Sequence, residues 1–206
     1  IDERLVGQTP LTTEVLETGS ELKIELVGYK THEQRVWTKA GTRSEQSPIK
    51  LIVADGTLQL SSSPSGASVT INNKFIGSTP LDVALAPFSK HRIELFLEGY
   101  LKSIQSVRLK PEKVSTLAVS LEPNIGTIAL TINPIDAQIL VDNRNQGTGS
   151  RILALIAKPH NISVQKEGYE TKILTVTPRP GHEQALSVNL LTVEQAYWAS
   201  RPPMVK

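Results

Sequence analysis

The sequence predicts an all-β protein of three tandem small antiparallel β-sandwich repeats of about 70 residues, followed by a short C-terminal helix. Three observations predict this class. The 206 residues include 16 Val, 17 Ile and 18 Thr, and such β-branched side chains favour pleated sheet. Several motifs return at a spacing near 70 residues. Apolar and polar residues also alternate along short segments, which is the period of a half-buried strand.

The composition excludes several classes of protein. The chain has no Cys, which removes disulfides, thiolate zinc sites and a cysteine nucleophile. Lys plus Arg number 22 and Asp plus Glu number 20. Because the two signs are interspersed, we expect no nucleic-acid partner. No apolar run reaches the roughly 18 residues that a membrane span needs, so we expect no direct membrane insertion.

The repeats are defined by three motifs. A glycine near the start recurs at intervals of 70 residues, as Gly7, Gly77 and Gly147. A Gly-Tyr pair follows at 28–29, 99–100 and 168–169, and a Gly-Thr segment at 56–57 returns at 126–127. We therefore place repeats at residues 1–55, 56–124 and 125–191, with a helical tail at 192–206.

The middle repeat is predicted strand by strand. Strands are expected, in order, over residues 57–61, 67–71, 74–77, 81–84, 92–97, 101–109 and 117–121. Asn72-Asn73 suits the tight hairpin between the second and third strands, because Asn tolerates positive φ. Gly99 supplies a left-handed conformation at a second hairpin tip. Seven strands in about 70 residues predict a small β-sandwich.

The two ends of the chain differ from the middle. Ile1 aligns with Ile71, so the first repeat lacks an opening strand and the chain is expected to be an excised fragment. The unpaired backbone and apolar surface left there predict weak edge-strand self-association with another copy. At the other end, Thr192 and Gln195 form the pattern of a helix capping box, and Pro202 with Pro203 is expected to stop the helix.

The motifs of the middle repeat resemble the PEGA domain, named for a Pro-Glu-Gly-Ala sequence. The residues concerned are Pro64-Ser65-Gly66-Ala67, Gly77 to Leu81, His91 and Gly99-Tyr100. Ser65 departs from the family pattern, as do Ile135-Asp136 and Gly149-Ser150-Arg151 in the third repeat. The resemblance implies a non-catalytic, immunoglobulin-like or prealbumin-like β-domain, often tandem, in bacterial and archaeal surface proteins. It transfers no catalytic, cofactor-binding or metal-binding residues.

A second resemblance concerns the C-terminus. Residues 201–206 resemble the lead-in to a formylglycine-generating, sulfatase-modifying-type domain. The resemblance implies such a domain next in the parent protein. Nothing in residues 1–206 could perform that chemistry.

Repeated polar residues are the candidate sites. His91 and His160 occupy equivalent positions, with Ser20 in the first repeat. A metal site would need an imidazole in each repeat and nearby carboxylates. We favour a structural role, in which the histidine bonds backbone groups before the long strand. We expect the unrepeated His32 and His182 to be surface residues.

The repeated tyrosines and the Asp and Asn residues of the turns could likewise have either a binding role or a structural role. The tyrosines of the Gly-Tyr pairs, Tyr29, Tyr100 and Tyr169, either form three binding positions or pack and send their hydroxyls to main-chain acceptors; we favour packing. Asp2, Asp142 and Asn72-Asn73 carry oxygens suited to calcium, but each turn offers too few ligands, so turn chemistry is favoured. Ser, His and Asp have no linking motif, so no catalytic triad is predicted.

These observations predict a non-catalytic structural spacer or interaction module of a bacterial cell-envelope protein, positioning a neighbouring domain. The alternative is a module that binds polysaccharide, peptidoglycan or a protein through an exposed sheet face or edge, with Phe96 and Trp37 as candidate contacts. We predict no catalytic, metal or cofactor site, and an extracytoplasmic location.

Overall fold

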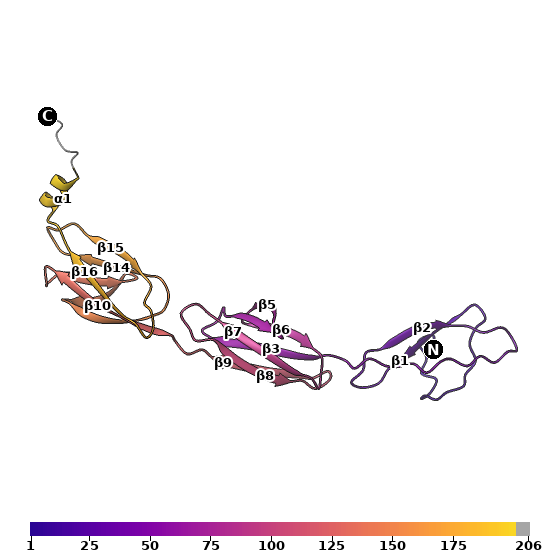
Figure 1. The fold of residues 1–206 in the computed structure, drawn as a ribbon. Helices are drawn as coiled ribbons and strands as arrows, with labels where there is room; N and C mark the ends of the chain where they lie inside the picture. Colours follow the sequence, from indigo (N-terminus) through magenta and orange to yellow (C-terminus); the bar gives the residue numbers. More distant parts are fainter. Residues whose placement is uncertain (201–206) are drawn as a thin grey trace. The chain divides into compact units, whose positions relative to one another are not determined.

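The computed structural model describes residues 1–200, and strands dominate it (Figure 1). The all-β fold class is therefore confirmed, with one short helix at the C-terminal end of the described chain. The residues form two compact units. The first contains residues 1–65, 69–93 and 104–119, and the second contains residues 66–68, 94–103 and those from 120 onward.

The seven strands expected in the middle repeat are all present. They are β3 (Gly56–Ser63), β4 (Ser68–Ile71), β5 (Lys74–Ser78), β6 (Leu81–Leu85), β7 (Lys90–Phe96), β8 (Ser103–Arg108) and β9 (Val114–Ser120). They form a three-stranded sheet of order β6-β3-β9 and a four-stranded sheet of order β5-β4-β7-β8. Asn72 and Asn73 both have positive φ, at 49° and 67°, so the predicted tight hairpin is confirmed.

The third repeat has the same arrangement. Its strands are β10 (Ile125–Asn133), β11 (Gln138–Val141), β12 (Arg144–Thr148), β13 (Arg151–Ile156), β14 (His160–Gln165), β15 (Lys172–Val176) and β16 (Glu183–Asn189). Sheets β13-β10-β16 and β12-β11-β14-β15 contribute to one apolar core. Along β10 every second residue is buried, because successive side chains point to opposite faces. Ile128, Leu130 and Ile132 are the core residues of that strand.

The opening strand β10 lies between two partners. It pairs antiparallel with β13, from Ile125 opposite Ile156 to Leu130 opposite Arg151. On its other side it pairs with β16 in parallel, from Thr127 opposite Glu183 to Asn133 opposite Asn189. The prediction of a purely antiparallel sandwich is therefore wrong for this pair. About 50 residues separate the two strands, and a long connection permits parallel pairing, whereas a tight hairpin does not.

Residues 1–54 contain only two strands, β1 (Ser20–Ile24) and β2 (His32–Val36), which pair antiparallel. In the alignment of the repeats, residues 11–16 correspond to β13 and residues 44–50 to β16. Neither segment forms a strand. Several large apolar side chains in this part are exposed, among them Leu5 at 97% and Val27 at 90%.

The expected C-terminal helix is α1 (Val193–Ala199). Thr192 accepts a hydrogen bond from the Gln195 N–H, and the Gln195 side chain accepts one from the Thr192 N–H, so the predicted capping box is confirmed. The expected stop at Pro202-Pro203 lies outside the described residues. Within residues 1–200, no helix has the length and apolar character required to cross a bilayer.

The position of Ile128 in the core predicts a large difference between two matched substitutions. Ile128 on β10 is fully buried, whereas Ile152 on the adjacent β13 is 72% exposed. We expect Ile128→Ala to lower the free energy of unfolding of the third repeat by about 2–5 kcal/mol, because it removes buried methyl groups and leaves a cavity. Ile152→Ala should cost less than about 1 kcal/mol. Hydrogen exchange of residues 125–189 under increasing urea measures both, and equal losses would contradict the described core.

Candidate functional site

The hairpin turn and the long strand of each repeat are joined by a pair of hydrogen bonds. In the second repeat the Asn72 N–H donates to the Arg92 carbonyl at 2.9 Å, and Asn72 Oδ1 accepts from the Arg92 N–H at 3.0 Å. Asp142 makes the same two bonds with Asn161, and Asp2 makes them with Glu21. This turn-to-strand contact therefore recurs in all three repeats. It explains why Asn or Asp stands at the turn.

A buried histidine extends this contact in the second repeat. His91 is 5% exposed. Its Nε2 lies 2.7 Å from the Ala86 carbonyl oxygen and its Nδ1 lies 3.0 Å from the Asn72 amide nitrogen. Because a carbonyl only accepts, Nε2 carries the proton, and Nδ1 is free to accept from the amide. A neutral imidazole satisfies both partners.

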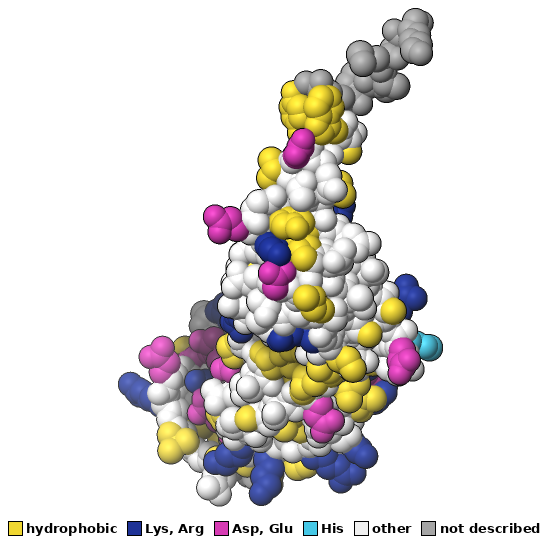
Figure 2. Space-filling view, turned by 90° about the vertical axis from the view of Figure 1, so that its left-hand side faces the viewer, with side chains coloured by type: hydrophobic (Ala, Val, Ile, Leu, Met, Phe, Trp, Pro, Cys, Tyr) yellow, Lys and Arg dark blue, Asp and Glu magenta, His cyan; other side chains and the backbone are white. Residues whose placement is uncertain are grey.

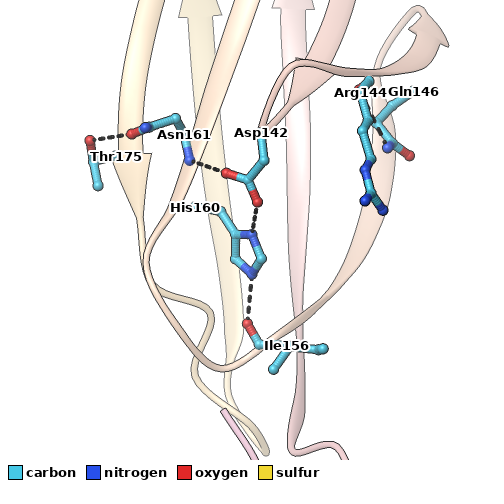
Figure 3. Close-up of polar contacts among 7 residues, drawn as sticks. All are labelled: Asp142, Arg144, Gln146, Ile156, His160, Asn161 and Thr175. Carbon is cyan, nitrogen blue, oxygen red and sulfur yellow. Dashed lines mark hydrogen bonds and ion pairs between the residues drawn. The ribbon is translucent and has the colours of Figure 1, made fainter. Parts of the chain in front are cut away.

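The third repeat has an acidic partner in place of the amide (Figure 3). His160 Nδ1 lies 2.7 Å from Asp142 Oδ2, and Nε2 lies 2.9 Å from the Ile156 carbonyl oxygen. Both partners are acceptors when the carboxyl is ionised, so only the doubly protonated imidazolium donates to both. The hydrogen bond from the Asn161 N–H, followed by that from His160, lowers the pKa of Asp142 below its ordinary value of 3.8.

These contacts confirm the structural role predicted for the repeated histidines. Each imidazole bonds a main-chain carbonyl, as expected, and both ring nitrogens have partners. The side-chain partners Asn72 and Asp142 were not predicted, although they occupy equivalent positions in the two repeats, as the histidines do. Ser20, the equivalent of the histidines in the first repeat, is also buried and accepts a hydrogen bond from the Leu16 N–H at 3.1 Å. In the described part of the chain, no three His, Asp or Glu side chains are grouped as metal ligands would be.

The remaining oxygen candidates belong to turns. Asp2, Asn72 and Asp142 all have positive φ, so each has the turn conformation that was predicted for it. Both carboxylate oxygens of Asp142 accept hydrogen bonds from protein groups.

The unrepeated histidines differ from each other. His182 is exposed, as expected. His32 begins β2, is partly buried, and its Nε2 lies 3.3 Å from the Gln34 amide oxygen.

The Gly-Tyr hairpin of each repeat pairs with the segment that leaves the repeat. The backbone pairs are Tyr29 with Val53, Tyr100 with Pro123 and Tyr169 with Thr192. In the third repeat the Glu170 N–H donates to the Leu191 carbonyl at 2.9 Å, and the Val193 N–H donates to the Gly168 carbonyl at 3.1 Å. We call this arrangement the exit clamp. The same pair of bonds joins Lys30 and Gly28 to residues 52 and 54, and Leu101 and Gly99 to residues 122 and 124.

The exit clamp changes the interpretation of the tyrosines. The recurring contact is made by the main chain, and sequence reasoning did not identify it. The Tyr169 ring packs against the core of the third repeat and lies 5.2 Å from Lys166 Nζ, which confirms packing for that residue. Tyr29 is 36% exposed, so the first repeat covers its ring less completely. The hydroxyl bonds to main-chain acceptors stay a prediction.

Several aromatic side chains are exposed, among them Phe75 and Phe88 at 65% and 66%. Phe96 and Trp37 are 56% and 64% exposed. On the helix, Tyr197 and Trp198 meet edge to face with centroids 5.6 Å apart. Figure 2 shows hydrophobic side chains gathered at this helical end, while acidic and basic side chains are scattered over the face in view.

Comparisons with known proteins identify the two complete repeats. The sequence pattern of the PEGA domain matches residues 55–125 and 125–194. The match leaves out residues 1–54 and gives no support to the second resemblance, whose residues lie outside the described chain. No curated protein matches the sequence.

The solved structures that are similar to the chain include a Bacillus anthracis protein and a streptococcal protein. The Bacillus anthracis TIE protein is 13% identical, with a TM-score of 0.45; the match covers 80% of this chain and 37% of that one. A streptococcal ancillary pilin is 11% identical, with a TM-score of 0.29; the match covers 82% of this chain and 73% of that one. The chain thus spans about 37% of the length of the first of these structures.

The exit clamp predicts that removing one donor will loosen helix α1. Val193 is the first helical residue, where proline is tolerated, and Thr192 already has the extended backbone that proline requires before it. Val193→Pro therefore removes the hydrogen bond to Gly168 and leaves the helix able to form. In a Trp37→Phe background, we expect lower fluorescence anisotropy of Trp198 for Val193→Pro than for Val193→Ala, which keeps the N–H. Equal anisotropy in the two variants would show that the clamp does not hold the helix.

The lowered pKa of Asp142 predicts acid sensitivity in the third repeat. A carboxyl with a depressed folded-state pKa adds stability above its unfolded value of 3.8, and this stability is lost as the pH falls through the folded value. We expect Asp142→Asn to be tolerated at pH 7, since Asn72 fills this position in the second repeat, and to reduce the loss of stability below about pH 4. Urea unfolding followed by hydrogen exchange at several pH values measures this.

The reciprocal variant Asn72→Asp provides the control. It should make the second repeat lose stability at low pH in the same way as the third repeat does in the wild type. If the stability of the third repeat falls with pH in the same way in the wild type and in Asp142→Asn, the assigned role of the Asp142 carboxylate is excluded.

Proposed function

The chain belongs to the PEGA domain family, and we propose that it is a non-catalytic structural spacer of a bacterial cell-envelope protein that positions a neighbouring domain. The observation that supports this proposal most directly is the repeated exit clamp. In three places the chain leaves a repeat while hydrogen-bonded to the hairpin of that repeat. Such bonding restricts the direction of the outgoing segment, which is what a positioning module requires.

The chemistry of the repeated residues supports the same proposal. The polar groups that recur, His91 with Asn72 and His160 with Asp142, donate to and accept from one another and the main chain. Groups whose hydrogen-bonding capacity is used inside the fold stabilise that fold. We also propose an extracytoplasmic location, because PEGA domains occur in surface proteins.

Binding of a glycan or a protein through a sheet face is the second candidate function. Phe96 favours it, because its ring lies on the exposed side of β7 and is 56% exposed. Aromatic rings on flat faces are the usual platforms for sugars and for protein partners. We rank it behind the spacer because neither Glu25 nor Gln165, the equivalents of Phe96, is aromatic, whereas the exit clamp is present three times.

The spacer function predicts the dimensions of the chain in solution. A compact protein of this length has a radius of gyration of about 17 Å. If successive repeats are held apart by their clamped exits, small-angle scattering should give a clearly larger value. The same measurement in about 0.5 M salt serves as a control, because screening weakens charge repulsion and leaves the hydrogen-bonded clamps intact. A value near 17 Å would mean that the repeats fold onto one another, and the spacer proposal would fail.

A further inference from the structure

The hairpin glycines of the three repeats differ in what surrounds them. Gly28, Gly99 and Gly168 have nearly the same left-handed backbone, with φ of 86°, 82° and 79°. A Cβ atom at position 168 would meet no atom within 4 Å, and one at position 28 would make an ordinary contact with Pro111. At position 99 it would overlap with Cγ2 of Ile156 in the third repeat. Of the three hairpins, only the second therefore needs glycine for close packing as well as for its backbone conformation.

Ile156 is held in place by its main-chain contacts. It lies opposite Ile125 in the pairing of β10 with β13. Its carbonyl oxygen accepts hydrogen bonds from His160 Nε2 at 2.9 Å and from the Lys158 N–H at 2.7 Å. Because Cγ2 is bonded directly to the branched Cβ, only a rotation about the stiff χ1 angle could move it aside. A side chain at position 99 would therefore push the hairpin away from the third repeat.

Main-chain hydrogen bonds connect the same segments. The Asn124 N–H donates to the Gly99 carbonyl at 2.9 Å, and the Ala157 N–H donates to the Asn124 carbonyl at 2.7 Å. Gly99 and Ala157 also form an antiparallel bridge. Residues 94–103 and the third repeat belong to one compact unit. The segment at Asn124 is thus bonded both to the repeat that it leaves and to the repeat that it enters.

We propose that Gly99 is a positioning residue, whose missing side chain lets the hairpin of the second repeat lie directly against residues 156–158 of the third. The inference rests on the proposed spacer function, since this junction is what holds the third repeat to the hairpin before it. The first junction is built differently. There the Gly28 N–H donates to the Glu112 carboxylate at 3.1 Å, and a side chain at position 28 would have room.

Hydrogen exchange of the Ala157 amide tests the proposal, with Gly168→Ala as the matched control. Both Gly99→Ala and Gly168→Ala place a Cβ atom on a left-handed backbone, so they introduce similar strain. Relative to the core amides of β10, which report global opening of the third repeat, the Ala157 amide should exchange about five- to tenfold faster in Gly99→Ala, because its hydrogen bond to Asn124 is lost. Gly168→Ala should leave this ratio unchanged. Equal ratios in the two variants would overturn the proposal.

Substitutions of Ile156 separate the overlap from the backbone strain. Ile156→Ala removes Cγ2, so its combination with Gly99→Ala should return the exchange of the Ala157 amide to the rate in Ile156→Ala alone. Ile156→Val keeps Cγ2, and its combination with Gly99→Ala should show no rescue. If both substitutions rescue, or if neither does, the overlap with Cγ2 does not set the junction.

Two further measurements cover the remaining outcomes. If Gly99→Ala fails to fold, Gly99→Asn supplies the same Cβ atom on a residue that tolerates positive φ. In the wild type, a nuclear Overhauser effect should join the γ2 methyl group of Ile156 to the α protons of Gly99, and its absence would refute the junction directly. A compact chain in small-angle scattering would instead reject the spacer function, so the two failures are distinguishable.

Discussion

The fold of each complete repeat depends on its opening strand. In the third repeat this strand, β10, lies at the centre of its three-stranded sheet. It pairs antiparallel with β13 on one side and parallel with β16 on the other. Its inner side chains also lie in the core that the two sheets share. In residues 1–54 the hairpin β1-β2 forms through local pairing, while residues 11–16 and 44–50 form no strand.

A second level of organisation connects turns to strands. The hairpin Asn or Asp holds the beginning of the long strand, a buried histidine or serine lies beneath it, and the Gly-Tyr hairpin at the other end of that strand holds the exit segment. Each repeat therefore controls where its chain enters the second sheet and where it leaves. The exit clamp uses main-chain groups alone, so it persists while the side chains vary from one repeat to the next, whereas the turn-to-strand contact also needs the side-chain oxygen of Asn or Asp.

One of these contacts differs chemically between repeats. An amide faces His91, and a carboxylate faces His160. The amide of Asn72 donates to a ring nitrogen of His91, whereas the ionised carboxylate of Asp142 accepts from His160. The hydrogen bonds that Asp142 accepts lower the pKa of its carboxyl, and the second repeat has an amide at the equivalent position. The apolar cores, which carry no such groups, are equivalent in both.

The sequence by itself determined the repeats, seven strands in the middle repeat, the Asn72-Asn73 hairpin and the capped helix. These features depend on alternation, turn chemistry and capping, which are local properties. Only the tertiary structure decided that β10 and β16 run parallel, that His160 bonds Asp142 and that the Gly-Tyr backbone holds the exit segment. In each case the partners are 18 or more residues apart in the chain, and sequence periodicity carries no information on which distant segments pair.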